Sequence, residues 1–594
     1  MITTTGPGLF QPHALALAIA LGAAAPAQAI TFAIGEIEGQ FDSSLSVGAS
    51  WSMRSADPDL IGANNGGQGQ SQTGDDGRLN FKKGETFSKI FKGIHDLELK
   101  YGDSGVFVRG KYWYDFELKD EKRLFKDIDD HNRKTAAQAS GAEILDAFFY
   151  HNYAVADLPG TFRIGKQVVS WGESAFIQNS INAINPVDAA AFRRPGAEVK
   201  EGLIPVNMFY LSQTLTDNLS AEAFYQLEWD QTVVDNCGTF FSSSDVVADG
   251  CDHNDTVGSP AIAPLQPIAA AGGQGFEVAS EGVVVPRAGD RDARDDGQWG
   301  LALRWMGDDA EYGAYFLNYH SRTPIFSTQT AGSATLAALP GILAATPAPF
   351  RSGLAQSVML GNGSYFLEYP EDIRLYGLSF ATSLPTGTAW SGELSYRPNM
   401  PLQLNSTDLT RALVNPITGG STSPIATAPG ADNNGYRRME VTQAQTTFTH
   451  FIDQVMGADR LTLVGELGVT RIGGLASPED GERFGRDSLF GVFGFEGDTH
   501  GFYTSTSWGY RTRAIWDYSN VFAGINLKPN LSWSHDVDGY GPVFNEGAKA
   551  ISVGLDAEYR NTYSASLSYT DFFGGEYNTA VDRDFLALSF GVNF

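Results

Sequence analysis

The sequence predicts an all-β fold, a transmembrane antiparallel β-barrel of about 16 strands within a range of roughly 14 to 18. Three observations predict this class. The chain ends in an alternating strand with an aromatic last residue, many earlier segments alternate in the same way, and the connections between them are either tight or very long. Strands that face lipid on one side and water on the other require this pattern.

The last strand is predicted at 584–594. Large apolar residues recur there at every second position, at Leu586, Leu588, Phe590, Val592 and Phe594. A period of two places them on one face of a strand. The pattern resembles the sorting signal that outer-membrane barrels present to their assembly machinery. Phe590, Val592 and Phe594 are therefore expected to form an assembly signal, and the barrel-assembly machinery is an expected partner.

Residues 1–29 are predicted to be a signal peptide. They contain no Asp, Glu, Lys or Arg, and Ala27-Gln28-Ala29 has the small-x-small form of a cleavage site. The apolar run at 14–25 is too short to span a membrane, and no Lys or Arg precedes it, which departs from the usual pattern. The remainder, 30–594, is expected to be one barrel domain in the cell outer membrane of a Gram-negative bacterium.

The clearest internal strand is predicted at 106–118. One of its faces is apolar and aromatic, and the other carries Arg109, Lys111, Asp115 and Glu117. A charged face cannot meet lipid, so it is expected to line a wet lumen and to influence which solutes pass. The other predicted strands are 41–54, 94–102, 142–154, 160–169, 204–214, 219–229, 299–305, 310–320, 372–383, 388–397, 437–451, 459–471, 500–512, 518–534, 551–557 and 562–573.

The predicted connections are of two kinds. Tight turns with Gly, Asp, Asn or Pro are expected at 101–106, 306–309, 384–387 and 560–562. Long polar loops are expected at 55–90, 233–296, 322–362, 398–435 and 473–498. Short periplasmic turns and long extracellular loops are the arrangement of outer-membrane barrels.

The net charge of −28 argues against a nucleic-acid partner, because phosphates demand Lys and Arg. Much of the acid lies in the predicted loops. It is interpreted either as an ordinary solvated surface or as loops that share divalent cations with lipopolysaccharide phosphates. Outer-membrane lipid and lipopolysaccharide are expected partners in both cases.

Cys237 and Cys251 are the only cysteines and are 14 residues apart. An even number in an exported chain predicts one structural disulfide, worth about 3 kcal/mol by the chain-entropy treatment. His253 is the only other soft ligand nearby, so no metal is expected at this place.

The segment 163–208 does not fit a simple barrel. Strand alternation stops near Val169, prolines follow Asn185 and Arg194, and charge of both signs is dense. An irregular polar stretch can fold into the lumen, so 170–202 is predicted to be a luminal constriction or plug. Its charged residues are interpreted either as selectivity groups or as ion pairs that pin the segment to the wall: Glu173, Asp188, Arg193, Arg194, Glu198 and Lys200.

Motifs for chemistry are weak. Gly102-Asp103-Ser104-Gly105 is similar to a serine-hydrolase loop but lies between two strands, where a hairpin turn is the better interpretation. Arg294 breaks calcium-loop spacing among the acidic residues 290–296. His151, His320 and Ser170 have no local signature. We expect no catalytic residue, no metal and no cofactor, and therefore no enzyme.

Four blocks carry a family resemblance: GKQVVSWGES, INAINPVD, RRPGAEVKEGLIPVNM and LSAEAFYQLEW. They resemble a large Gram-negative family known only as a domain of unknown function. The resemblance implies an outer-membrane barrel, often encoded beside envelope export or lipid-trafficking components and near genes for hydrophobic substrates. It supplies no active-site residues. In general shape the chain is similar to long-chain fatty-acid channels.

The expected function is passage of a small hydrophobic or amphipathic solute, steroid-like or long-chain acid-like, by binding and diffusion. One alternative is a docking or structural barrel for a periplasmic lipid-trafficking or efflux complex. Another is an outer-membrane enzyme that acts on envelope lipid.

Overall fold

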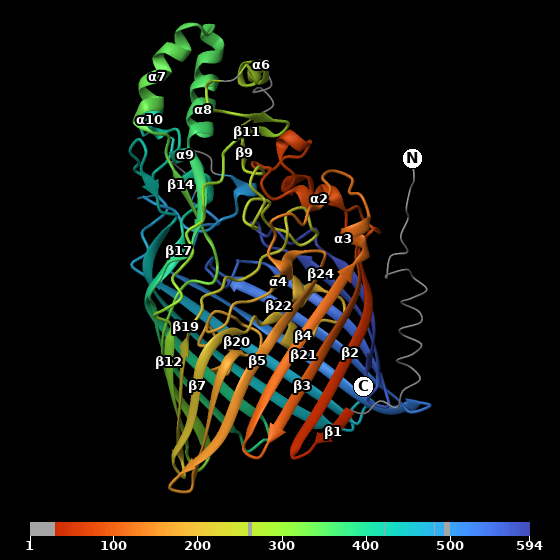
Figure 1. Ribbon diagram of the computed structural model, residues 1–594. Helices are drawn as coiled ribbons and strands as arrows, with labels where there is room; N and C mark the ends of the chain where they lie inside the picture. Colours follow the sequence, from red (N-terminus) through yellow and green to blue (C-terminus); the bar gives the residue numbers. More distant parts are fainter. Residues whose placement is uncertain (1–29, 259–263, 272, 421, 480, 492–498) are drawn as a thin grey trace.

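A computed structural model describes residues 30–258, 264–271, 273–420, 422–479, 481–491 and 499–594. The predicted signal peptide lies outside these residues. The described chain forms a closed antiparallel barrel, since strand β2 (Ile37–Ser52) pairs with β3 (Thr86–Tyr101) on one side and with the last strand, β25 (Phe585–Asn593), on the other. The short β1 (Ile30–Ile34) folds back on β2 at the lower end of the barrel (Figure 1).

Eighteen strands make the wall, each paired with its neighbours in chain order. Besides β2, β3 and β25, they are β4 (Ser104–Asp115), β5 (Ser140–Val155), β6 (Leu158–Gln167), β7 (Val206–Thr216), β8 (Leu219–Gln226), β12 (Trp299–Met306), β13 (Ala310–Tyr319), β16 (Ile373–Ser383), β17 (Ala389–Gln403), β19 (Tyr436–Asp453), β20 (Arg460–Gly473), β21 (Thr506–Phe522), β22 (Ile525–Asp538), β23 (Lys549–Tyr559) and β24 (Tyr563–Phe573).

The predicted fold class is confirmed, and each alternating segment of the sequence corresponds to one wall strand. The count of eighteen is close to the predicted 16 and lies within the predicted range of 14 to 18. Some boundaries were wrong. β21 begins at Thr506 and continues to Phe522, because the turn lies at Ala523 and Gly524, which both have positive φ.

The strand predicted at 106–118 ends three residues early. Asp115 accepts hydrogen bonds from the backbone N–H groups of Glu117 (3.0 Å) and Leu118 (3.2 Å), and so caps the short helix α3 (Phe116–Asp120). An N-cap carboxylate satisfies donors that a helix leaves unpaired. Glu117 therefore lies on this helix and not on the luminal face of a strand.

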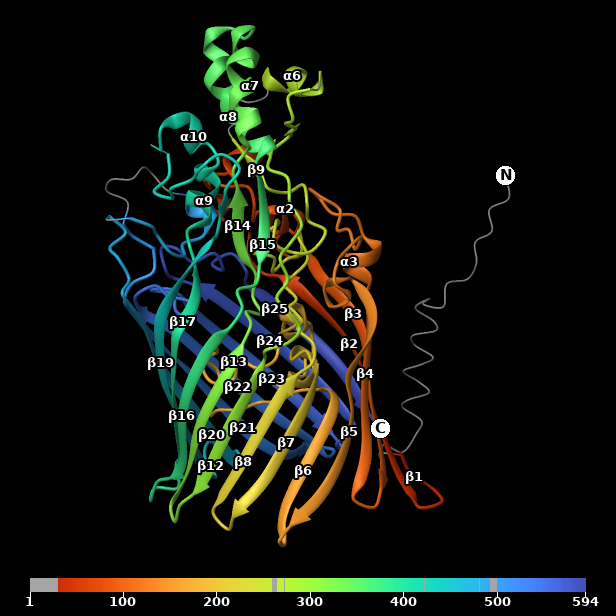
Figure 2. The ribbon, with the colours of Figure 1, turned by 60° about the vertical axis from the view of Figure 1, so that its left-hand side comes forward.

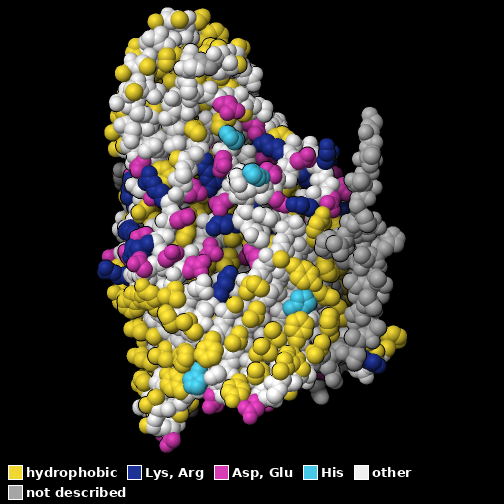
Figure 3. All heavy atoms as spheres, in the orientation of Figure 1, with side chains coloured by type: hydrophobic (Ala, Val, Ile, Leu, Met, Phe, Trp, Pro, Cys, Tyr) yellow, Lys and Arg dark blue, Asp and Glu magenta, His cyan; other side chains and the backbone are white. Residues whose placement is uncertain are grey.

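The outer surface of the wall carries an apolar belt. Leu301, Leu303 and Trp305 on β12 are each about half exposed and point away from the lumen. Figure 3 shows the belt over the lower part of the barrel, with charged side chains gathered above it. Such a belt is what contact with lipid chains requires. No helix in the described part of the chain is long and apolar enough to cross a membrane.

The two ends of the barrel differ as the sequence predicts. One end, called the turn end here, has tight connections such as Gly102-Asp103 between β3 and β4. The other, the loop end, carries the long segments, and helices α7 (Ser333–Ala344) and α8 (Arg351–Asn362) rise farthest from the wall (Figure 2). The predicted loop at 322–362 is thus largely a helical hairpin, which packs Leu339, Leu354 and Val358 into a small core.

The remaining elements also belong to the loop end or the lumen. The helices are α2 (Asp76–Asn80), α4 (Ala189–Arg193), α5 (Val199–Gly202), α6 (Gln266–Ala270), α9 (Ser406–Ala412) and α10 (Asn415–Thr418), and the short strands are β9 (Thr256–Val257), β10 (Val278–Ala279), β11 (Gly282–Val284), β14 (Ile325–Gln329), β15 (Ser364–Glu368) and β18 (Asp432–Asn433). Strands β9–β11 form one small sheet, and β14, β15 and β18 form another.

Candidate functional site: a segment across the lumen

Residues 168–205, called the inward segment here, connect the neighbouring strands β6 and β7 by a detour into the barrel. Asn185 ties the base of this detour. Its side-chain oxygen accepts a hydrogen bond from the N–H of Val169 (3.0 Å), and its amide nitrogen donates to the carbonyl of Ile204 (3.0 Å). Pro186 follows directly and cannot continue a regular ladder. The base divides the segment into a first limb, 169–185, and a second limb, 186–203.

The first limb lies against the wall from β8 to β20. Glu466 on β20 accepts three backbone N–H groups of this limb, from Ala175 (3.0 Å), Phe176 (2.7 Å) and Ile177 (2.6 Å). Glu393 on β17 accepts the N–H of Glu173 (2.5 Å). Because irregular backbone has no ladder of its own, buried wall carboxylates take the place of strand partners.

Side-chain donors of the wall hold the carbonyl groups of the same limb. The guanidinium of Arg397, fully buried, donates to the carbonyls of Asn179 (3.0 Å) and Ser180 (2.6 Å). Trp171 donates its indole N–H to Glu222 on β8 (2.7 Å). Donors and acceptors are thus matched on both sides of the contact, which fixes the limb in one position.

The second limb crosses to the opposite wall. Lys92 on β3 forms a buried ion pair with Glu201 (2.5 Å) and also donates to the carbonyl of Gly196 (2.6 Å). Lys111 on β4 pairs with Asp188 at 3.0 Å. Because β3 and β4 lie across the barrel from β17 and β20, the inward segment spans the lumen and narrows it.

Most of the charged residues that the sequence singled out form ion pairs or hydrogen bonds. Arg109 pairs with Asp96 (2.7 Å) and Asp146 (3.3 Å), and Asp115 caps α3. The other contacts are Glu117 with Lys89 and Arg123, Arg193 with Asp235, Arg194 with the carbonyl of Ala136, and Lys200 with Glu198. Glu173 is half-buried and Glu198 is exposed. Their influence on selectivity stays a prediction.

Sequence reasoning missed the wall residues that hold the segment. Glu393, Arg397, Gln443, Gln445 and Glu466 bind it from β17, β19 and β20. Their signal is alternation, since polar residues at every second position mark the inward face of each strand. That signal identifies the face but not the partner.

A cavity of about 750 Å³ lies on the loop-end side of the inward segment. The segment forms its floor, and residues that follow β13 and end β17, among them Ile325 and Leu402, form part of its wall. Three apolar side chains of the segment are exposed here inside the protein: Phe176 (36%), Phe192 (40%) and Val199 (73%). The amide side chains of Gln178, Asn179 and Asn182 also reach the cavity.

The wall from β22 through β25 to β2 has a different luminal surface. Strand register places small residues inward there: Ser532, Ser534, Ala550, Ser552, Gly554, Ser564, Ser566, Ser568, Thr570, Ala587, Ser589, Gly591, Ser44, Ser46, Gly48 and Ser50. We call this surface the serine wall. Gly48 and Ser589 on it lie close to Pro195 and Gly196 of the inward segment, and Ser44 donates a hydrogen bond to Glu198 (3.3 Å). Charged groups appear toward the turn end, at Lys528, Asp556 and Glu558.

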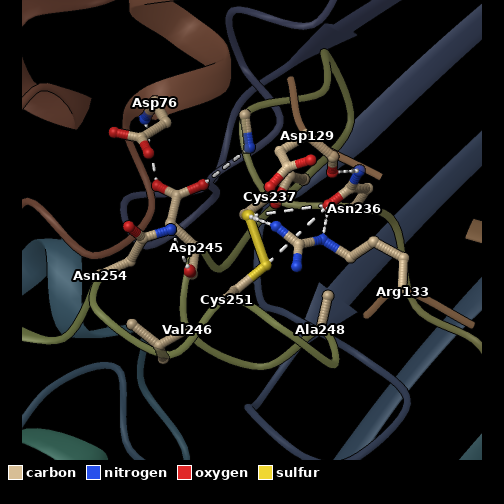
Figure 4. Close-up of a disulfide and its surroundings, with 12 residues drawn as sticks. Asp76, Asp129, Arg133, Asn236, Cys237, Asp245, Val246, Ala248, Cys251 and Asn254 are labelled. Carbon is tan, nitrogen blue, oxygen red and sulfur yellow. Dashed lines mark hydrogen bonds between the residues drawn. A yellow bond between two sulfur atoms is a disulfide. The ribbon is translucent and has the colours of Figure 1, made fainter. Parts of the chain in front are cut away.

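The predicted disulfide between Cys237 and Cys251 is present at the loop end (Figure 4). Arg133 donates from Nε to the side chain of Asn236 (2.5 Å) and contacts the sulfur of Cys237 (3.3 Å). The disulfide therefore closes a short loop within the long connection after β8, and Arg133 joins that loop to the one that follows α3.

Close to the disulfide lies a buried acidic cluster of Asp75, Asp76 and Asp245 (Figure 4 shows the latter two). Burial raises the pKa of Asp75 to about 6, against opposing hydrogen bonds from Asn65 and Gly62. Burial and the charge of Asp245 raise the pKa of Asp76 more than its ion pair with Lys126 lowers it. Asp75 and Asp76 thus bind protons more tightly in the folded loop than in the unfolded chain.

Solved structures of outer-membrane proteins are similar in outline to this chain. Acinetobacter baumannii OccAB1 aligns at 10% identity and a TM-score of 0.40, covering 96% of this chain and 98% of that chain. The outer membrane protein opdK from Pseudomonas aeruginosa aligns at 9% and 0.38, covering 93% and 98%. The outer membrane channel DcaP of Acinetobacter baumannii aligns at 9% and 0.35, covering 96% and 100%.

At these values the likeness carries no argument about function. No curated protein matches the sequence. Residues 11–594 match a family described as "Protein of unknown function (DUF1302)".

Proposed function

This chain belongs to the DUF1302 family, as the sequence blocks predict, and we propose that it is an outer-membrane channel for a small amphipathic solute. The solute has an apolar body and a polar head, as a steroid-like or long-chain acid-like molecule has. It passes by binding and diffusion, without a chemical step. The long loops then face the cell exterior and the tight turns face the periplasm, and the apolar belt supports this placement in the membrane.

The cavity above the inward segment carries this proposal. Its volume of about 750 Å³ lies within the range of small-molecule pockets. Phe176, Phe192 and Val199 present apolar surface to water there, whereas other apolar side chains of the segment, such as Ile177, Ile181 and Ile184, are buried. When a ligand covers apolar surface that is exposed within a cavity, the free energy of the complex falls. The apolar body of the solute supplies that cover.

The polar lining suits the other end of an amphipathic molecule. Gln178, Asn179 and Asn182 border the same cavity, and Asn182 donates to the hydroxyl of Ser170 (3.0 Å). Amides offer both donors and acceptors, so a hydroxyl, carbonyl or carboxyl head finds a partner without a buried charge. A few polar groups in an apolar pocket fix the orientation of a ligand.

The test is binding to the purified barrel in lipid nanodiscs, with empty nanodiscs as the blank and a fluorescent long-chain fatty acid as the probe. Replacing Phe176 and Phe192 by Ser should raise the Kd by about tenfold, which corresponds to about 1.4 kcal/mol of lost apolar burial. The matched control is Phe350→Ser, since Phe350 is 44% exposed but lies at the tip between α7 and α8. An unchanged Kd in the double variant, or an equal loss in the control, contradicts the proposal.

A second measurement separates the channel from a docking barrel. Steady single-channel conductance of the refolded protein in a planar bilayer supports a path through the lumen. A folded but silent barrel that co-purifies with a periplasmic protein and binds no probe contradicts the channel.

A further inference from the structure

The hydrogen-bonded ladder between β16 and β17 stops before the loop end of the barrel. Its last pair is Tyr376 with Tyr396. Beyond it, β17 continues to Gln403 and pairs with β19, with a register shift between Arg397 and Met400, whereas Ile373–Leu375 of β16 pair only with β13. The upper part of β17 thus has a free edge toward β16. We call this gap in the wall the β16–β17 split.

Two prolines in the sequence of β17 explain why the split forms. Pro398 and Pro401 both lie in its unpaired part. Proline has no N–H to donate, so it is confined to strand edges and bulges, and two of them prevent a regular ladder with β16. On the other side, Asp372 has φ +57°, which is unusual for a residue with a Cβ and turns the chain away just before β16 begins.

Side chains bridge the split in place of a ladder. Arg397, the first residue of β17 beyond its last pair with β16, donates to the hydroxyl of Tyr319 on β13 (2.9 Å). Asn399 accepts a hydrogen bond from the N–H of Arg374 (3.0 Å) and donates to the carbonyl of Asp372 (2.8 Å). Arg438 on β19 donates to the carbonyls of Asn399 (3.3 Å) and Glu371 (2.7 Å). Side-chain contacts of this kind open at lower cost than a continuous ladder, because only a few hydrogen bonds separate.

The split borders both the cavity and the membrane interface. Ile373 on one side of it and Met400 and Leu402 on the other line the cavity. On the outer surface, Tyr376 and Tyr396 stack just below it and are 47% and 36% exposed. Outward aromatic residues mark the boundary between lipid chains and head groups. An amphipathic molecule in a membrane lies at this depth.

We infer that the β16–β17 split is a lateral doorway between the cavity and the outer leaflet of the membrane. The inference rests on the proposed function and gives its solute a route. The apolar body of the solute passes between the two strands, and its polar head stays at the height of Asn399 and Arg438. Opening separates Asn399 from Arg374 and Asp372, Arg438 from Glu371 and Arg397 from Tyr319, and it leaves the pairing of β17 with β19 in place.

Cross-linking tests the doorway. Arg374 and Pro398 would pair if the ladder continued, so the variant Arg374→Cys/Pro398→Cys places two thiols across the split, and the native cysteines are already joined. A short bismaleimide should join these thiols. It should lower, by at least about tenfold, the rate at which a fluorescent long-chain fatty acid exchanges between its binding site in the protein and the lipid. The same treatment of Thr382→Cys/Trp390→Cys, paired at the turn end, should leave the rate unchanged.

The opposite change gives a second readout. Asn399→Ala removes both hydrogen bonds that the side chain makes and should raise the transfer rate by roughly tenfold. Asn530→Ala is its control, because Asn530 faces the lumen on β22 and bonds Asp556 (2.9 Å) far from the split. Unaltered transfer in both the cross-linked protein and Asn399→Ala, with the probe still bound, overturns the doorway alone. Loss of probe binding to the unmodified protein overturns the proposed function.

Discussion

At the scale of single residues, Glu466 holds the first limb of the inward segment through its backbone. Its carboxylate holds three consecutive N–H groups and is 2% exposed. Glu466→Ala leaves the three donors without this acceptor, and the buried N–H of Ile177 alone costs about 1–3 kcal/mol when it is unpaired. We expect faster amide hydrogen exchange at 175–177 and larger, noisier single-channel currents. Glu466→Gln keeps one acceptor and should show a smaller change.

A matched control for Glu466 is Glu98→Ala, since Glu98 faces the lumen on β3 and accepts only from the hydroxyl of Tyr150 (2.6 Å). If exchange at 175–177 is the same in Glu466→Ala as in this control, the carboxylate does not hold the limb.

Asp75 gives the loop end a pH dependence. Its pKa is raised to about 6 in the folded loop, so the folded state binds a proton that the unfolded state releases near pH 4. The contribution of Asp75 to the stability of this loop is therefore greatest below pH 4 and is lost as pH rises through 6, by roughly 3 kcal/mol. Asp75→Asn should remove most of the fall, measured as proteolysis of residues 57–84 between pH 4 and 8. Asp59→Asn, at an exposed position of the same loop, should keep it.

At the scale of elements, we expect the inward segment to act as a constriction of the barrel. Because its base joins neighbouring strands, replacing 172–200 by a short Gly-Ser linker can leave β6 and β7 paired. Single-channel conductance should rise several-fold, since the segment contacts both β3 and β20 across the lumen. Replacing 334–361, the α7–α8 hairpin outside the lumen, should leave conductance unchanged. Equal conductance in the two variants contradicts a constriction.

At the scale of the whole molecule, periodicity predicted the architecture because it is a local property. Each wall strand alternates over its own length, so the eighteen segments could be found one at a time. The sequence also predicted that 170–202 enters the lumen. It could not predict that Glu466, almost 290 residues away, holds Phe176, because that contact depends on the closure of the barrel.

Local signals also competed at some boundaries. The helix at 116–120 follows from one cap by Asp115, which overrode the alternation that continues through Leu118. The hairpin of α7 and α8 lies in a stretch rich in Gly, Ser, Pro and Ala, whose composition predicts a loop. Its helices are stabilised by a core with Val283 and Val285, which the sequence places far away.

The serine wall has a consequence for kinetics. Under the proposed function, the hydroxyls and small side chains of this wall offer few apolar contacts to a solute that has left the cavity above the inward segment. We then expect the solute to spend most of its time bound in the cavity above the inward segment and little time beside the serine wall. The flux of solute should saturate once the cavity above the inward segment is occupied. The external concentration at which it saturates should not depend on how fast solute is removed on the periplasmic side.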